Sequence, residues 1–210
     1  MSEWTIVRRA VSIAGMITDA ASGRPIADAL IELTGGPPAF VAIRTTLARD
    51  PAWARQAERL DRRHSRPDGL YAFSDLPPGS YALRVSAPGQ GSRYGVTTLP
   101  TVVVSNEREP SGRIKLAPAD ATLAPTRISG RVLRGDTNPR RPAIGAQVRL
   151  RGDTSVVRSD DDGRFTLSGL TAGTPTLEIT AQGYQTFTQA VTLAAGQEQS
   201  MNSLVLTAGP

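Results

Sequence analysis

The sequence predicts an all-β protein of two tandem β-sandwiches, the first with a short helical insertion. Residues 68–79 (DGLYAFSDLPPG) return as residues 162–173 (DGRFTLSGLTAG), 94 positions later, and such repetition indicates two copies of one domain. Apolar and polar side chains alternate at residues 81–86 (YALRVS), the pattern of a half-buried strand. The 210 residues include 20 Gly and 16 Pro, so short strands joined by frequent turns are expected.

The opening strands of the two copies can be aligned directly. Residues 13–17 (IAGMI) face residues 128–132 (ISGRV) at an offset of 115, and residues 25–33 face residues 142–150 at an offset of 117. Because the offset then falls to 94, the first copy contains 23 additional residues. This insertion must lie between Leu33 and Asp68.

The insertion is predicted to be an amphipathic helix at about residues 48–66. Asp50 suits the N-cap, and Pro51 suits the first helical position. Helical spacing then gives one apolar face of four residues: Trp53, Ala57, Leu60 and His64. The rest of the helix is charged and mostly basic.

Two interpretations of this helix stay open. It packs on its own sandwich as a lid, or it docks onto a neighbouring protein subunit. A membrane-surface helix fits less well, because the apolar face is small. The candidate partner-binding residues are Trp53, Arg55, Arg59 and Arg62.

Asp68-Gly69 and Asp162-Gly163 lie between short strands, where Gly supplies the positive φ of a tight hairpin turn. Residues 160–162 are all Asp and suggest calcium, but Thr171 stands where a calcium loop carries its terminal Glu. The first copy makes the same turn without this cluster. Hairpin chemistry is therefore the preferred explanation, weak calcium binding is the alternative, and no metal or other cofactor is predicted.

Between the two copies, residues 118–126 (PADATLAPT) are predicted to be a short, fairly stiff linker. The predicted domains are therefore residues 1–117 and residues 127–210.

The ordered motifs resemble the carboxypeptidase regulatory-like domain. These motifs are Ile-x-Gly-x-Ile/Val, then Pro-Ile/Ala-x-x-Ala-x-Ile/Val-x-Leu, then Asp-Gly-x-Tyr/Phe with a following Leu-x-x-Gly. The resemblance covers most of both halves and implies a seven-stranded transthyretin-like (immunoglobulin-like) sandwich in each. It implies no peptidase activity, because the His and Glu ligands of a zinc peptidase are missing. The copies depart from the shared pattern in places: Pro175 stands where the first copy has Tyr81, and Tyr184 stands where the first copy has Gln90.

Composition limits the function classes. The absence of Cys excludes disulfides and thiolate metal sites. The net charge is +5, but Lys115 is the only lysine among 24 basic residues, and the arginines are scattered. Scattered charge without interleaved aromatic residues does not favour nucleic acid as a partner.

No catalytic set is recognisable. His64 is the only histidine, it lies in an Arg-rich segment, and no nucleophile motif accompanies it. We therefore expect no catalytic residues and no enzymatic activity.

The chain contains no apolar run of the roughly 20 residues that a membrane-spanning helix needs. The apolar stretch at residues 10–17 is short for a signal peptide, and it recurs internally as a strand. We therefore expect the protein in the cytoplasm or in a particle assembled there, without membrane insertion.

The sequence favours a structural or adaptor protein that contacts other protein subunits, with an accessory role in a phage-tail-like contractile injection particle as a family-level analogy. The alternative is a carbohydrate- or peptide-binding accessory module. A glycan ligand has little support, since Trp4 and Trp53 lie outside the repeated cores and form no paired platform.

Overall fold

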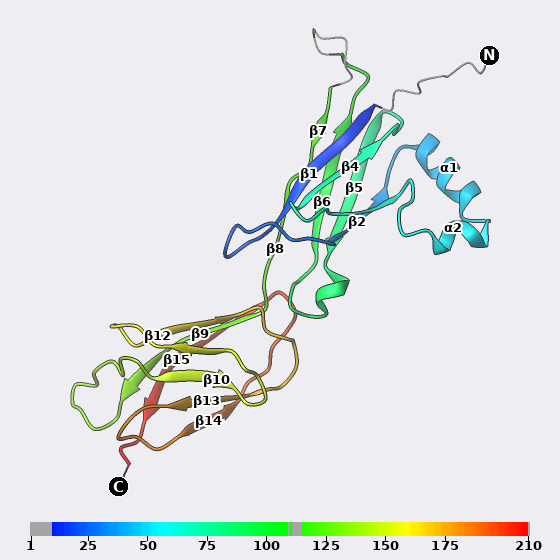
Figure 1. Ribbon diagram of the computed structural model, residues 1–210. Coiled ribbons are helices and arrows are strands. Elements are labelled where there is room, and N and C mark those ends of the chain that lie inside the picture. Colours follow the sequence, from blue (N-terminus) through cyan, green and yellow to red (C-terminus); the bar gives the residue numbers. More distant parts are fainter. Residues whose placement is uncertain (1–9, 109, 111–114, 210) are drawn as a thin grey trace, which may run out of the picture. The chain divides into compact units, whose positions relative to one another are not determined.

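The computed structural model describes residues 10–108, 110 and 115–209 (Figure 1). Trp4 therefore lies outside the described residues. The chain divides into two compact units: unit 1 comprises Met1–Gly89 and Val96–Leu123, and unit 2 comprises Gln90–Gly95 and Ala124–Pro210. The predicted all-β fold of two tandem sandwiches is confirmed.

The described residues of unit 1 form two sheets, two short α-helices and one 3-10 helix. Its elements in chain order are β1 (Val11–Asp19), β2 (Leu30–Gly35), α1 (Pro38–Leu47), α2 (Pro51–Arg55), β3 (Arg62–His64), β4 (Leu70–Ser74), β5 (Gly79–Ser86), η1 (Pro88–Gln90, its last residue counted with unit 2), β6 (Thr97–Val104), β7 (Ala117–Pro118) and β8 (Ala121–Leu123). One sheet has the order β4-β1-β7, with β8 also paired to β1, and the other has the order β3-β2-β5-β6. Between them lies a core that includes Ile13, Ile31, Phe73 and Leu83, each 0% exposed.

Unit 2 repeats this plan without helices in its described part. Its elements are β9 (Arg127–Arg134), β10 (Gln147–Leu150), β11 (Val156–Arg158), β12 (Arg164–Ser168), β13 (Thr176–Thr180), β14 (Phe187–Ala190) and β15 (Glu198–Leu206). The sheets have the orders β12-β9-β15 and β11-β10-β13-β14. The strand count of seven for the described residues agrees with the predicted sandwich. The core includes Ile128, Val148, Leu177 and Ile179, each 0% exposed.

The closing strand of each unit runs parallel to its opening strand. In unit 2, β15 pairs with β9 along its length, with a register shift between Met201 and Leu204. In unit 1 the equivalent strand is broken into β7 and β8, which both pair with β1. At the break, the backbone N–H of Met16 donates to the Asp120 carboxylate at 2.8 Å.

This pairing corrects the predicted linker at residues 118–126. Residues up to Leu123 belong to the first sandwich, as the second half of its closing strand. The Pro- and Asp-containing sequence looked like a linker because a strand of three residues is too short to show alternation.

The glycine of the Ile-x-Gly motif is required for steric reasons in both units. A Cβ at Gly15 would lie 2.2 Å from the carbonyl oxygen of Ala119, and a Cβ at Gly130 would lie 2.7 Å from that of Met201. The closing strand therefore approaches the opening strand closely only because this position lacks a side chain.

Candidate functional site

The helical insertion of unit 1 is anchored by Phe40. This α1 side chain is 0% exposed, and its ring packs edge-on against Tyr81 with centroids 5.2 Å apart. The Arg44 guanidinium donates a hydrogen bond to the carbonyl oxygen of Leu33 at 3.1 Å, which ties α1 to β2. The helix is thus fixed by one aromatic residue and one arginine.

Three apolar side chains of α1 are exposed. Val41 is 38% exposed, Ile43 44% and Leu47 37%. Ile43 and Leu47 are four residues apart and therefore lie on the same side of the helix. Helix α1 was not predicted from the sequence, although Pro38 in the first helical turn is a helix-start signal.

Trp53 on α2 is enclosed by its own domain. Only 9% of it is exposed, and the Arg59 guanidinium lies 4.3 Å from its ring centroid. Arg59 also forms an ion pair with Asp61 at 3.0 Å, in which both side chains are largely buried. The Asp50 carboxylate accepts the Ala52 N–H at 2.8 Å, as predicted for the N-cap.

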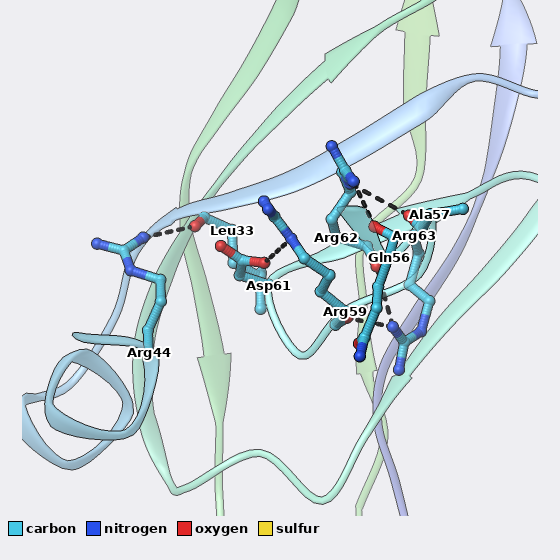
Figure 2. A network of polar contacts seen from close by, with 8 residues as sticks. All are labelled: Leu33, Arg44, Gln56, Ala57, Arg59, Asp61, Arg62 and Arg63. Carbon is cyan, nitrogen blue, oxygen red and sulfur yellow. Dashed lines mark hydrogen bonds and ion pairs between the residues drawn. The ribbon is translucent and has the colours of Figure 1, made fainter. Parts of the chain in front are cut away.

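Arginine side chains close the loop that follows α2, as Figure 2 shows. Arg62 donates to the carbonyl oxygens of Gln56 and Ala57, and Arg63 donates to that of Arg59. These bonds hold residues 56–62 in a tight loop next to β2. The backbone N–H of Leu33 adds a bond to the Asp61 carbonyl at 2.8 Å.

The single helix predicted at about residues 48–66 is therefore wrong in extent. The helix α2 ends at Arg55, and residues 62–64 form β3, whose His64 pairs with Leu30 of β2. Trp53, Leu60 and His64 do have helical spacing. Residues 62–64 nevertheless pair with β2 instead of continuing the helix, because tertiary contacts override local periodicity.

The structure does not place the four candidate partner-binding residues on one face. Trp53 is buried, while Arg59 and Arg62 make contacts within the domain. Arg55 is exposed, and no hydrogen bond or ion pair of its side chain is found among the described residues. Of the two interpretations, packing on the sandwich accounts for Trp53, and Arg55 stays a candidate contact.

Unit 2 contains a polar groove at one end of its β11-β10-β13-β14 sheet. Its volume is about 750 Å³. The residues that characterise its lining are Arg134, Ile144, Gln147, Arg158, Gln182 and Tyr184. Gln147 pairs with Arg158 on one side and with Thr180 on the other, so these three side chains form a row on the outer face.

A hydrogen-bonded triad forms one wall of this groove. Arg134 donates to the Tyr184 hydroxyl at 2.6 Å, and that hydroxyl donates to the Asp136 carboxylate at 2.8 Å. The bonds from Arg134 and then Tyr184 lower the pKa of Asp136 below its ordinary value, so this carboxylate stays charged. The triad fixes the position of the Tyr184 ring.

The equivalent row of unit 1 has different chemistry. Leu30 pairs with His64 and Ser86, where unit 2 has Gln147 with Arg158 and Thr180. The shared fold therefore carries an arginine and an amide in one copy and an imidazole and an apolar side chain in the other. Of the residues around this groove, only the change from Gln90 to Tyr184 was identified from the sequence.

The Asp160–Asp162 cluster serves the hairpin turn. The Asp160 carboxylate accepts the backbone N–H groups of Asp162 and Arg164, at 3.0 and 2.7 Å, and the Asp162 carboxylate bonds the Arg164 side chain. Within the described residues, no group of three or more His, Asp and Glu side chains is arranged to hold a metal ion. No helix of the described part is long and apolar enough to span a membrane.

The family model of the carboxypeptidase regulatory-like domain matches the chain twice, at residues 12–109 and 127–207. The chain belongs to the carboxypeptidase regulatory-like domain family. The two matches correspond to the two sandwiches, so each half is one such domain. No curated protein matches the chain.

Several solved structures are similar to these carboxypeptidase regulatory-like domains. A type II cohesin–X-dockerin complex from Acetivibrio cellulolyticus is 25% identical, with a TM-score of 0.35, over 40% of this chain and 58% of that chain. This chain therefore spans little more than half of that protein's length. GBS52, the minor pilin of Streptococcus agalactiae, is 16% identical over 94% of this chain and 96% of that chain, with a TM-score of 0.32. The shaft pilin SpaA from Lactobacillus rhamnosus GG is 10% identical over 97% of this chain and 99% of that chain, with a TM-score of 0.41.

Proposed function

We propose that the chain is a non-enzymatic structural or adaptor protein that acts through contacts with other protein subunits. The observation that carries this proposal is a pair of exposed apolar side chains on one side of α1. Ile43 and Leu47 are four residues apart and are each more than a third exposed. Grouped exposed apolar side chains favour a protein contact.

The position of α1 adds support. The helix belongs to an insertion that unit 2 lacks between its β10 and β11, so the sandwich itself does not require it. The exposed Arg55 on the neighbouring α2 supplies a positive charge to the same insertion. An apolar centre with a charged rim is the usual composition of a protein interface.

A finer hypothesis is an accessory role in a phage-tail-like contractile injection particle, in the cytoplasm or in a particle assembled there. It rests on the analogy with small tandem modules alone. Recovery of sheath, tube or baseplate-like subunits with the chain is its expected outcome.

The test is affinity purification of the tagged chain from its native cell, with mass spectrometry of the retained proteins. The double variant Ile43→Glu with Leu47→Glu should lose the partner by about tenfold, because charge on an apolar contact is costly. Val103→Glu is the matched control, since Val103 is also apolar and is 59% exposed on β6. The proposal fails when the wild-type chain retains no protein, or when both variants retain the partner equally.

A second candidate function, binding of a peptide or carbohydrate by an accessory module, is favoured by the polar groove of unit 2. Its volume of about 750 Å³ is within the range of ligand-binding clefts.

A further inference from the structure

The groove of unit 2 contains an arginine whose charge is not balanced. Arg158 is exposed, and no ion pair or hydrogen bond of its guanidinium is found in the described part of the chain. The other arginines on this face differ, because Arg149 and Arg151 share the carboxylate of Glu178. Arg134 is likewise paired, with Asp136.

The surroundings of Arg158 offer hydrogen bonds of both kinds. Gln147 is its direct cross-strand neighbour, and Gln182 lines the same groove. A primary amide donates and accepts, so it matches the N–H and C=O groups of a peptide backbone. Ile144, 64% exposed, gives the groove one apolar contact.

We infer that this groove binds an extended, acidic segment of a partner protein, with an Asp or Glu side chain of that segment on Arg158. The guanidinium is planar and forms paired hydrogen bonds with a carboxylate. The amides of Gln147 and Gln182 would bond the backbone of the segment, while the fixed ring of Tyr184 forms the wall. This inference rests on the proposed function, because it names the chemistry of a protein partner.

A peptide is favoured over a carbohydrate by the aromatic lining. Sugars bind on exposed ring faces, whereas Tyr184 is half-buried and its hydroxyl already bonds Arg134 and Asp136. The Arg134 guanidinium also lies 5.9 Å from the ring centroid. The groove therefore lacks a free aromatic platform and instead offers cationic and amide groups.

The test is titration of the isotope-labelled full chain with a synthetic peptide of alternating glutamate and alanine, followed by NMR. The side-chain amide signals of Gln147 and Gln182 should shift. Arg158→Gln should weaken binding by about tenfold, because one charge-assisted contact is lost. Arg151→Gln is the matched control: it removes the same charge from the turn directly after β10 of this sheet, but Arg151 already has Glu178 as a partner.

Three results would overturn the inference. The first is an equal effect of Arg158→Gln and Arg151→Gln, which would indicate general charge attraction. The second is equal binding of the peptide in which glutamine replaces glutamate. The third is tighter binding of oligogalacturonate than of the acidic peptide at the same amide signals, which would make the ligand a glycan.

The outcome is separable from that of the proposed function. When Arg158→Gln retains the cellular partner while the acidic peptide leaves the groove signals unchanged, the groove assignment is wrong and the protein-interaction function stands. When no cellular protein is retained but the peptide binds at Arg158, the groove assignment stands and the protein-interaction function is wrong.

Discussion

Trp53 is the buried aromatic residue of α2, in the second half of the insertion. It is packed beneath Arg59, which is in turn fixed by Asp61. Trp53→Ala should destabilise unit 1 by about 3 kcal/mol, because a large buried ring is replaced by a cavity. Urea unfolding followed by circular dichroism measures the change. Leu47→Ala, at an exposed position of the same insertion, should stay within about 0.5 kcal/mol, and a similar loss in both variants would contradict the burial of Trp53.

Tyr81 should make the stability of unit 1 sensitive to alkali. Burial raises its pKa to about 12 from the ordinary value of 10.0, so the unfolded chain loses this proton first. The stabilisation is complete below about pH 10 and is lost as the pH rises towards about 12. Thermal unfolding across this range measures the loss.

The control for this prediction is Tyr81→Phe. The variant lacks the hydroxyl that donates to the Pro77 carbonyl at 2.7 Å, so it should lose about 1 kcal/mol at neutral pH. It should also show a flatter decline in alkali. Identical slopes in the two proteins would exclude Tyr81 as the titrating group.

At the scale of single elements, the duplicated hairpin turn is tightly constrained. Gly163 has a φ of +75°, and a Cβ there would lie 2.4 Å from the carbonyl oxygen of Val132. Gly163→Ala should therefore cost about 3 kcal/mol, from backbone strain and the clash together. Gly152→Ala should cost about 1 kcal/mol, since its φ is +86° but nothing lies within 4 Å. Chemical denaturation of both variants compares the two costs, and equal values would show that the contact with Val132 is unimportant.

How well each element could be predicted depended on whether its signal was local. The Asp-Gly turns and the cap at Asp50 follow from the chemistry of one to four residues, and the structure confirms them. Strand β3 could not be found this way, because its three residues are defined by pairing with β2. The same holds for Arg59 and Arg62, whose bonding partners are set by the loop they close.

The candidate site was less predictable than the fold. The repeat aligns β1, β2, β4 and β5 with β9, β10, β12 and β13, but the polar side chains that characterise the groove stand at positions where the copies differ. Arg158 and Gln147 lie in different strands and become neighbours only through the register. A position-by-position alignment of the two copies that compares side-chain charge could have identified Arg158 and Gln147.

At the scale of the whole molecule, residues 90–95 are predicted to stabilise unit 2. The Thr126 backbone N–H donates to the Arg93 carbonyl at 2.7 Å, and the Ala172 N–H donates to the Ser92 hydroxyl at 2.9 Å. A fragment of residues 90–210 should therefore be more stable than one of residues 124–210, by about 2 kcal/mol. Urea unfolding of both fragments measures this, and Ser92→Ala in the longer fragment should remove part of the gain. Equal midpoints for the two fragments would contradict the assignment of residues 90–95 to unit 2.

The break of the first closing strand into β7 and β8 has a consequence for biosynthesis. Tandem domains of similar sequence are prone to exchange strands while they fold, and β1 and β9 carry the same motif. Because β8 ends at Leu123, the partners of β1 leave the ribosome before Arg127, the first residue of β9. The order of synthesis thus gives β1 its own parallel partners before the competing copy is complete.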